Sequence, residues 1–322
     1  MDLTIMQISI RLKPIYKKDY DLLKPYYKSY KSEAHDYNLT NLIIWRNKYD
    51  LHAIELDGYL FICFYPNDPD NTAFSEPIGD YSDEKALKQS TLLLIEFCKS
   101  EEIKLKFRYI GLVYKNLLLS WEVLGDANDV ENQFNTNEDS YDYCYLTEDL
   151  VNLSGKIYHR KKNNLNQFEK LYRDSNNHEP INQDNALDAL LVAKGWCVDR
   201  ECSENQDLCK EFEGIKDILT DWMFYSGRGV EGIIIYVDGL PKAFSIGEPL
   251  TEDMFLIHIE KASHDIQGIY AAINHRMAAH VLGRFAFINR EQDLGLEGLR
   301  KAKQAYNPHH MVEKWTFDHS MK

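Results

Sequence analysis

Two side chains in segment 255–262 could accept a proton from an attacking group, His258 and Glu260. The segment is typical of a strand, and alternation along a strand predicts both on one face, opposite Ile257 and Ile259. An imidazole or a carboxylate that lines a cleft can act as a general base toward an amine or a hydroxyl. The alternative is that both side chains only hydrogen-bond neighbours at the edge of a sheet.

Polar residues also follow the next predicted strand, at 285–288. Asn289 and Arg290 come directly after it, and α/β folds usually place ligand contacts at the carboxyl ends of strands. These two side chains are therefore candidates to orient a carbonyl or a leaving group. Alternatively, Asn289 makes a hydrogen bond that stabilises the loop, and Arg290 forms a surface ion pair with Glu291 or Asp293.

A candidate anion site lies where the strand at 254–261 turns into a helix at 268–282. Backbone N–H groups at the start of a helix bind anions such as a pyrophosphate, and Gln267 and Gly268 stand at this start. Asp265 argues against a pyrophosphate there, because its carboxylate would repel one unless it caps the helix. Gln267 and Gly268 are thus candidate donor-binding residues, with a single glycine as the pattern.

The sign of the charge changes sharply in the middle of the chain. Segment 122–149 has nine carboxylates and no Lys or Arg, whereas segment 156–173 has six basic residues and one acid. A predicted amphipathic helix begins here and offers N–H groups as well as cations to an anion. The candidates to hold the anionic part of a donor are Lys156, His159, Arg160 and Lys161. The alternative is a solvated helix face, and the glycine spacing of a P-loop is missing.

The elements that position these residues occur twice along the chain. The first half predicts a helix at 17–29 and a hairpin with strands at 53–55 and 60–65 that turns at Asp57 and Gly58. A helix capped by Ser82 and a strand at 104–109 follow. The second half predicts strands at 232–237, 242–246 and 254–261, followed by a helix at 268–282 and a strand at 285–288.

The repeated order indicates a duplicated domain. Residues 73–77 and 243–249 add a short sequence echo. We therefore expect an α/β (α+β) protein with two domains, residues 1–150 and 151–322, each with a mixed central sheet flanked by helices.

The composition limits the class of protein. A chain of 322 residues is long enough for two domains, and 44% hydrophobic with 27% charged residues is typical of a globular protein. The net charge of −14 argues against indiscriminate nucleic-acid binding, so a tRNA contact would need a local basic patch.

Membrane and metal patterns are missing from the sequence. No apolar run of roughly 18 residues and no signal-peptide pattern is present, which predicts a cytoplasmic protein without a membrane span. No metal is expected, because Cys197, Cys202 and Cys209 lack the spacing of zinc ligands.

Four strings of the sequence resemble a bacterial family of unassigned activity that is related to the C-terminal domain of phosphatidylglycerol lysyltransferases. They lie at 153–161, 258–262, 268–274 and 288–303, and the resemblance spans most of residues 20–318. It implies two tandem GNAT-like acyltransferase domains, a fold also used by tRNA-dependent aminoacyltransferases of peptidoglycan and lipid modification.

The resemblance also implies further site residues. The string at 268–274 adds Tyr270 and Asn274 as candidate donor-binding residues, and Tyr306 resembles the tyrosine that protonates the leaving thiolate in many GNATs. The chain departs from these relatives in two ways. It lacks the membrane helices of the lipid-modifying enzymes, which argues against a phospholipid acceptor. It keeps only Gln267 and Gly268 of the pyrophosphate loop, which weakens the case for acetyl-CoA.

The expected function is transfer of an activated acyl or aminoacyl group to an amine or hydroxyl acceptor, a small molecule or a peptide, in a cleft between the two domains. Glu260 or His258 would be the base, and Asn289, Arg290 and Tyr306 would orient the carbonyl or leaving group. The donor is either an aminoacyl-tRNA or an acyl-CoA. The alternatives are a CoA-dependent N-acetyltransferase and a non-catalytic ligand-binding protein on the same fold.

Overall fold

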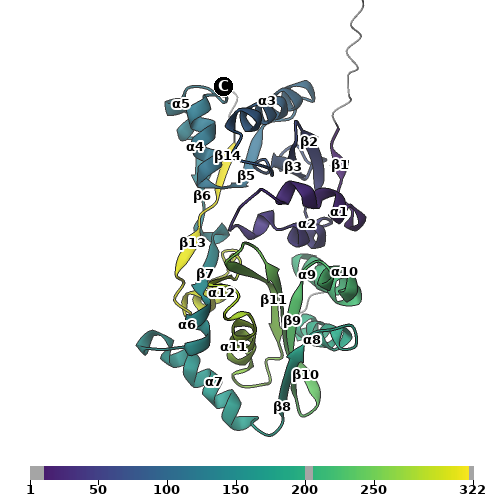
Figure 1. The fold of residues 1–322 in the computed structure, drawn as a ribbon, viewed down its shortest axis with the longest axis vertical. Coiled ribbons are helices and arrows are strands. Elements are labelled where there is room, and N and C mark those ends of the chain that lie inside the picture. Colours follow the sequence, from purple (N-terminus) through teal and green to yellow (C-terminus); the bar gives the residue numbers. More distant parts are fainter. Residues whose placement is uncertain (1–10, 200–205, 319–322) are drawn as a thin grey trace, which may run out of the picture. The chain divides into compact units, whose positions relative to one another are not determined.

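The computed structural model describes residues 11–199 and 206–318 (Figure 1). The chain forms two compact units, and each unit takes more than one stretch of sequence. The first contains the chain up to Lys31, Arg46–Thr136 and the segment from Lys314. The second contains Ser32–Trp45 and Asn137–Glu313.

The first unit is built on a seven-stranded mixed sheet with the order β1-β2-β3-β4-β5-β14-β6. Its strands are β1 (Lys13–Pro14), β2 (His52–Leu56), β3 (Tyr59–Phe64), β4 (Ala73–Phe74), β5 (Lys106–Ile110), β6 (Phe134–Thr136) and β14 (Trp315–Asp318). Its helices are α1 (Tyr20–Leu23), α3 (Glu84–Ser100), α4 (Leu112–Trp121) and α5 (Ala127–Glu131).

Local sequence explains most of this unit, with two corrections. Asp57 and Gly58 both have positive φ, at 49° and 82°, as the predicted two-residue hairpin between β2 and β3 requires. The cap of α3 is Asp83, which accepts from the backbone N–H of Ala86, so the prediction of Ser82 is wrong by one residue.

The single helix predicted at 17–29 is also wrong. The segment is a one-turn α1 between the 3-10 turns Lys17–Asp19 and Lys24–Tyr27. Pro25 lies in the second turn, and a proline has no N–H to continue an α-helical ladder, so the segment breaks there.

The second unit is built on a seven-stranded mixed sheet with the order β13-β7-β12-β11-β10-β9-β8. Its strands are β7 (Asp142–Leu146), β8 (Asn176–Pro180), β9 (Glu231–Val237), β10 (Leu240–Pro249), β11 (Met254–Ala262), β12 (Phe287–Asn289) and β13 (His310–Val312). Its helices are α2 (Leu39–Trp45), α6 (Thr147–Asn152), α7 (His159–Leu171), α8 (Ala186–Asp199), α9 (Gln206–Thr220), α10 (Trp222–Ser226), α11 (Ile269–Val281) and α12 (Glu297–Gln304). The elements predicted for 232–288 are all present.

The two sheets have the same internal plan. Each sheet contains one parallel pair of strands, β4 with β5 in the first and β11 with β12 in the second. All other neighbouring strands in the two sheets are antiparallel. The duplicated order expected from the sequence is therefore present in the tertiary structure. The predicted fold class, an α/β protein with two mixed sheets flanked by helices, is confirmed.

The units exchange one strand of this plan. The strand beside β5 is β14, from the end of the chain, whereas the matching strand beside β12 is β7, which follows the first unit in sequence. The boundary expected between residues 150 and 151 falls inside α6. The compact units do not follow that boundary, because β7 pairs with β12 and β13.

A β-bulge interrupts the pairing of β10 with β11. Ile246 lies opposite Ile259, but Gly247 lies opposite Ile257, which leaves His258 as the extra residue. The strict alternation predicted for 257–260 is therefore wrong, because a bulge shifts the residues that follow to the opposite face. Ile257 packs in the core with residues of α11, and Glu260 also bonds to that helix.

Helices cover both faces of the second sheet. Residues of α6, α7 and α11 form one core cluster with inward-facing residues of β9, β10 and β11, while α8 packs against β10 and β11 and also against α9. In Figure 1, α11 lies on one side of these strands and α8 on the other. Within the described residues, no helix is both long and apolar enough to cross a membrane.

Candidate active site

Glu260 and Arg290 form an ion pair at the point where β12 ends and β11 continues. The parallel pairing stops at Leu256 and Asn289, so β11 extends past its neighbour. Arg290 Nη2 donates to Glu260 Oε1 at 2.9 Å, and the two side chains are only 13% and 11% exposed. Asn274 of α11 donates from Nδ2 to the other carboxylate oxygen at 3.3 Å. Two predicted catalytic residues and one predicted donor-binding residue therefore meet here.

Two cations lie over the ring of Tyr306. Lys161 Nζ of α7 is 3.9 Å from the ring centroid, and Arg290 Cζ is 5.0 Å from it. Burial and then the neighbouring guanidinium lower the pKa of Lys161 to about 8. Burial raises the pKa of Tyr306 above its usual value, so its hydroxyl stays protonated at neutral pH.

Three buried polar atoms around this ion pair have no hydrogen-bond partner among the described residues. They are Arg290 Nη1, Asn274 Oδ1 and Ser245 Oγ. Ser245 lies directly opposite Glu260 on β10, where side chains of a cross-strand pair are neighbours. Buried polar atoms are nearly always paired in folded proteins. The group therefore offers one unpaired donor and two unpaired acceptors near Glu260 to a bound molecule.

His258 belongs to a different set of contacts. Its Nε2 lies 3.0 Å from Glu248 Oε1 and its Nδ1 lies 3.4 Å from Glu291 Oε1, with the imidazole wholly buried. Burial opposes the charged form, but the two carboxylates outweigh it and raise the pKa of His258 to about 9. At neutral pH the ring is an imidazolium, which cannot accept a proton, so Glu260 is the better base of the two candidates.

Asn289 stabilises the loop after β12. Its Oδ1 accepts from the backbone N–H of Glu291 at 2.6 Å. Its Nδ2 donates to the carbonyl of Glu33 at 2.7 Å and to Asp142 Oδ2 at 3.1 Å. These contacts match the loop-stabilising alternative, so we assign Asn289 to positioning Arg290 rather than to the substrate.

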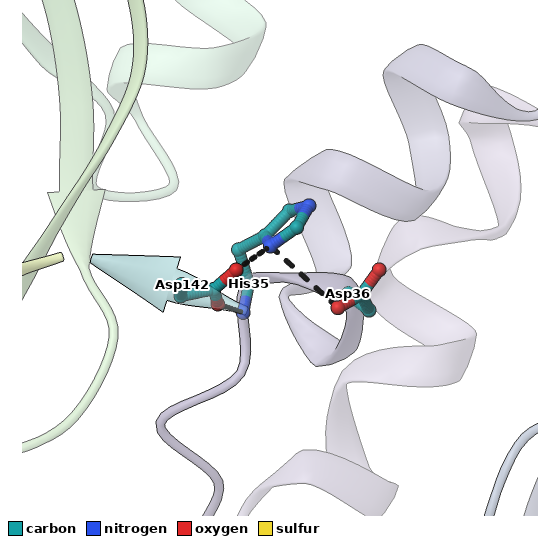
Figure 2. A group of neighbouring side chains, drawn as sticks. All are labelled: His35, Asp36 and Asp142. Atoms are coloured by element: carbon teal, nitrogen blue, oxygen red, sulfur yellow. Dashed lines mark hydrogen bonds and ion pairs between the residues drawn. The ribbon is translucent and has the colours of Figure 1, made fainter. Parts of the chain in front are cut away.

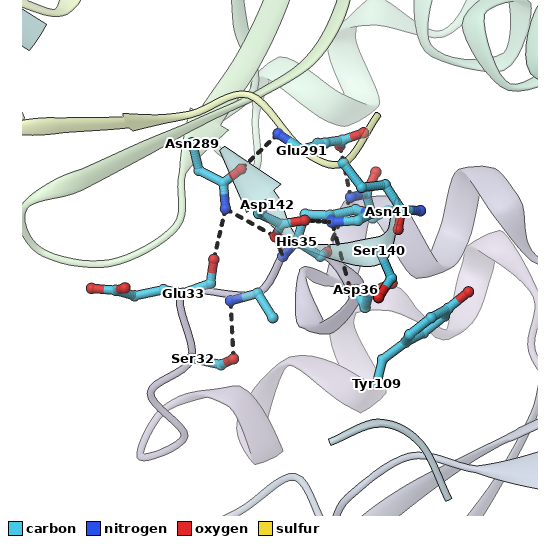
Figure 3. A network of polar contacts seen from close by, with 12 residues as sticks. Ser32, Glu33, His35, Asp36, Asn41, Tyr109, Ser140, Asp142, Asn289 and Glu291 are labelled. Carbon is cyan, nitrogen blue, oxygen red and sulfur yellow. Dashed lines mark hydrogen bonds and ion pairs between the residues drawn. The ribbon is translucent and has the colours of Figure 1, made fainter. Parts of the chain in front are cut away.

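Figure 2 shows a histidine and two carboxylates that could in principle share a metal ion, His35, Asp36 and Asp142. Asp142 already accepts from the backbone N–H of His35 at 2.8 Å and lies 2.7 Å from its Nδ1. Figure 3 shows the same carboxylate bonded to Asn289. Because hydrogen bonds account for both oxygens of Asp142, the group holds the segment around His35 to β7 and we assign no metal to it.

Lys303 was not among the residues predicted from the sequence. It is buried on α12, and its Nζ donates to the backbone carbonyls of Arg290, Glu291 and Gln292 at 2.6, 2.9 and 2.5 Å. An ammonium has three N–H bonds, and all three are used here. Lys303 therefore holds the loop that carries Arg290. The only sequence signal was its place in the string at 288–303.

The basic helix contributes one of its four predicted residues to this group. Lys161 faces the ion pair, whereas Lys156, His159 and Arg160 are exposed. Exposure on one helix face matches the solvated alternative for those three, and it also keeps them available to an anionic partner.

The start of α11 is covered by α7. A side chain at Gly268, which has a φ of 81°, would place its Cβ 2.3 Å from the carbonyl oxygen of Asn164. Gln267 donates from Nε2 to Gln167 Oε1 at 2.9 Å. These contacts explain both residues by helix packing without a ligand. Tyr270, in the first turn, donates to the carbonyl of Ala262 at 3.2 Å.

The family model described as phosphatidylglycerol lysyltransferase, C-terminal, matches residues 27–317. The chain belongs to this family. Among curated proteins, no sequence match was found.

Several solved structures share the fold over most of the chain. A conserved protein of unknown function from Bacteroides thetaiotaomicron is 29% identical with a TM-score of 0.81, and the match covers 95% of this chain and 98% of that one. L-PGS from Bacillus licheniformis is 11% identical with a TM-score of 0.64, covering 94% and 92%. FemX is 11% identical with a TM-score of 0.61, covering 94% and 96%. The predicted family resemblance is confirmed.

Proposed function

We propose that this chain transfers an acyl or aminoacyl group to an amine or hydroxyl acceptor at the Glu260–Arg290 ion pair. The observation that carries the proposal is the buried Arg290 Nη1, which has no hydrogen-bond partner among the described residues while Nη2 is held by Glu260. Membership of a lysyltransferase family supports the same reaction class.

Glu260 would act as the base. As the acceptor nitrogen or oxygen bonds to the carbonyl carbon, Glu260 takes the proton that the acceptor loses. When the tetrahedral intermediate collapses, the bond to the donor oxygen or sulfur breaks, and the protonated Glu260 returns the proton to that leaving atom. Positioned proton transfer of this kind accelerates reactions by roughly 10²–10⁴-fold.

Arg290 and Lys161 would stabilise the oxygen of that intermediate. The electrons of the carbonyl double bond move onto this oxygen, and a preorganised cation costs no reorganisation when the charge develops. Arg290 Nη1 is the nearer candidate donor because it is buried and unbonded. Lys161 of α7 lies over the ring of Tyr306, as Arg290 does, and adds positive charge near it.

The pattern of unpaired atoms favours an aminoacyl group over an acetyl group. An acetyl group offers only a carbonyl oxygen, which Arg290 could bind. An aminoacyl group also carries N–H donors, which Asn274 Oδ1 and Ser245 Oγ could accept. The cover of α7 over Gly268 also argues against a pyrophosphate at the start of α11, as an acyl-CoA donor would need.

A charged tRNA is the donor that these features support. The exposed face of α7 and the turn before it carry cations that could contact phosphates: Lys156, Arg160 and Lys162, with His159 beside them. Such contacts release counterions, so the affinity should fall steeply with salt. Substituting Arg160 and Lys162 together with Ala should weaken RNA binding and reduce the salt slope.

The test is a transfer assay with the full chain. Total tRNA charged with radiolabelled amino acids is offered with small amines, alcohols and vesicles of phosphatidylglycerol, and acetyl-CoA replaces the tRNA in a parallel arm. The Glu260→Gln variant should lose at least about 100-fold in rate because the amide cannot take a proton. Glu297→Gln is the matched control, since that side chain is 80% exposed on α12.

The outcomes separate the proposal from its rivals. Transfer only from acetyl-CoA would replace the aminoacyl donor with the CoA-dependent alternative. Equal activity of wild type and Glu260→Gln would remove Glu260 from the chemistry. Binding of charged tRNA without transfer to any acceptor would favour the non-catalytic binding protein.

A further inference from the structure

A cavity of about 270 Å³ lies on the second unit, beyond the Glu260–Arg290 pair. It is lined by Trp196 and Asp199 of α8, Ala262 and His264 at the end of β11, and Tyr270 of α11. We call it the Trp196 cavity. Ala262 is two residues beyond Glu260, a separation of about 6–7 Å along a strand.

The aromatic walls of the Trp196 cavity are held by contacts of their own. Lys261 Nζ lies 3.7 Å from the centroid of the Trp196 ring. Lys261 is itself fixed by Glu211 of α9 at 2.6 Å. Tyr270 is tied through its hydroxyl to the carbonyl of Ala262. Two rings restrained in this way form a preorganised site for a flat, apolar group.

The charges around the cavity favour a neutral guest. A cation would meet the positive charge of Lys261, which already interacts with the Trp196 ring. An anion would meet Asp199, whose Oδ2 lies 2.9 Å from His264 Nδ1. The cavity wall therefore repels guests of either charge, whereas a neutral ring meets no charge repulsion from Lys261 or Asp199.

The rim supplies polar groups for the edge of such a ring. Asp199 and His264 are 43% and 76% exposed at their side chains, so both can exchange their mutual contact for a ligand. A carboxylate accepts, and an imidazole can donate or accept. A phenyl ring would leave these groups unused, whereas the edge of a nucleobase offers both donors and acceptors.

The size of the cavity limits the guest. A volume of about 270 Å³ is slightly below the usual range of small-molecule sites, roughly 300 to 1,000 Å³. It suits one ring system rather than a whole nucleotide. We propose that the Trp196 cavity binds a neutral nucleobase, stacked on Trp196 or Tyr270 and bonded at its edge to Asp199 or His264.

This inference goes beyond the proposed function and does not depend on it. If the chain also transfers an aminoacyl group, the base would belong to a nucleotide whose reactive end lies toward Glu260. Base binding can be measured without any turnover, so the two proposals can fail separately.

The experiment is calorimetric titration of the full chain with adenosine, guanosine, cytidine and uridine. Base–aromatic stacking contributes roughly 1–3 kcal/mol per base, so Trp196→Leu should weaken binding by roughly 5- to 150-fold. Tyr270→Leu is the second variant, because Tyr270 is 42% exposed and tolerates replacement. Leu187→Ala, 58% exposed on the same helix as Trp196, is the matched control and should bind as wild type does.

Asp199→Asn and His264→Gln should alter the ranking of the four nucleosides. Failure of all four nucleosides to bind at millimolar concentration would overturn the proposal. So would wild-type affinity in both Trp196→Leu and Tyr270→Leu. Binding of N-acetylphenylalaninamide in place of the nucleosides would overturn it in favour of an aromatic side chain.

Discussion

Arg290 has two different environments at the two nitrogens of its guanidinium. Nη2 is held by Glu260, while Nη1 is buried and has no hydrogen-bond partner among the described residues. The loop below it is fixed by Asn289 and by Lys303, which binds three carbonyls. A planar guanidinium can hold a carboxylate and present a second donor at once, which an ammonium cannot do in the same geometry.

Replacing Arg290 with Lys should therefore separate the two roles. We expect the positive charge beside Glu260 to persist and kcat/KM for transfer to fall by about 10²–10³, the usual loss of one oxyanion donor. Arg276→Lys is the control, because Arg276 pairs with Glu169 on the neighbouring helices. Equal kinetics of the two variants would contradict a role for Nη1.

His258 makes stability depend on pH. Its pKa is raised from 6.5 to about 9 in the folded state, so its contribution is complete below pH 6.5 and is lost as the pH rises through about 9. Relative to His258→Gln, the free energy of unfolding of the wild type should fall by roughly 3 kcal/mol between pH 6 and pH 9.5.

Urea denaturation at these two pH values measures the difference. His264→Gln, with a side chain 76% exposed, should keep the pH dependence of the wild type. A constant difference between wild type and His258→Gln across this pH range would show that the two carboxylates do not stabilise the imidazolium.

At the scale of elements, the bulge in β11 and the contact of α7 with α11 assemble the site. The bulge turns Glu260 toward α11, where Asn274 can reach it. The close approach of α7 at Gly268 brings Lys161, from the same helix, to Tyr306. Neither contact would be possible with regular alternation on β11 or with a side chain at position 268.

Gly268→Ala tests the helix contact. The new Cβ would lie 2.3 Å from a backbone carbonyl of α7, and alanine is also strained at a φ of 81°. We expect a loss of more than about 2 kcal/mol in the free energy of unfolding, together with reduced transfer activity. Gly283→Ala is the control, because Gly283 has a φ of 83° and open space around it.

Comparison of the two variants separates the cost of the clash with α7 from the cost of backbone strain, because only position 268 has the close contact. Gly283→Ala should lose only the cost of the left-handed backbone, about 1–2 kcal/mol. Equal losses in the two variants would mean that α7 moves aside at no cost, and the argument against a pyrophosphate at this helix start would weaken.

At the scale of the whole molecule, the exchange of β7 and β14 makes the folding of each half of the sequence depend on the other half. Phe317 of β14 is buried in the core of the first unit beside Phe107 and Phe134. β7 supplies Tyr143 and Tyr145 to the core of the second unit. Each half of the sequence therefore lacks a buried strand that the other half carries.

Fragments 1–150 and 151–322 should consequently fail to fold when produced alone. Fragment 1–150 would lack β14, the partner of β5, and fragment 151–322 would lack β7, the partner of β12. Each fragment would therefore have unpaired backbone groups on one strand and an open core. Circular dichroism melts and amide dispersion in NMR spectra measure this directly. A cooperative melt of isolated 151–322 would contradict the exchange and restore the boundary expected at 150. The cleft expected between the two domains stays a prediction.

The sequence by itself determined the elements and the chemistry of the site residues. The hairpin at Asp57 and Gly58, the helix after Gly268 and the duplicated order follow from turn residues and from hydrophobic period, which are local properties. Glu260 was predicted because it is a charged residue within an apolar strand, and Arg290 because it directly follows the end of one.

Only the tertiary structure decided the rest. The bulge at His258, the charge on its ring, the choice of Lys161 from four basic residues and the exchange of β7 with β14 all depend on residues far apart in the sequence. Strand register, burial and the pKa of a side chain are set by what packs against it, and alternation along one strand contains no information about that partner.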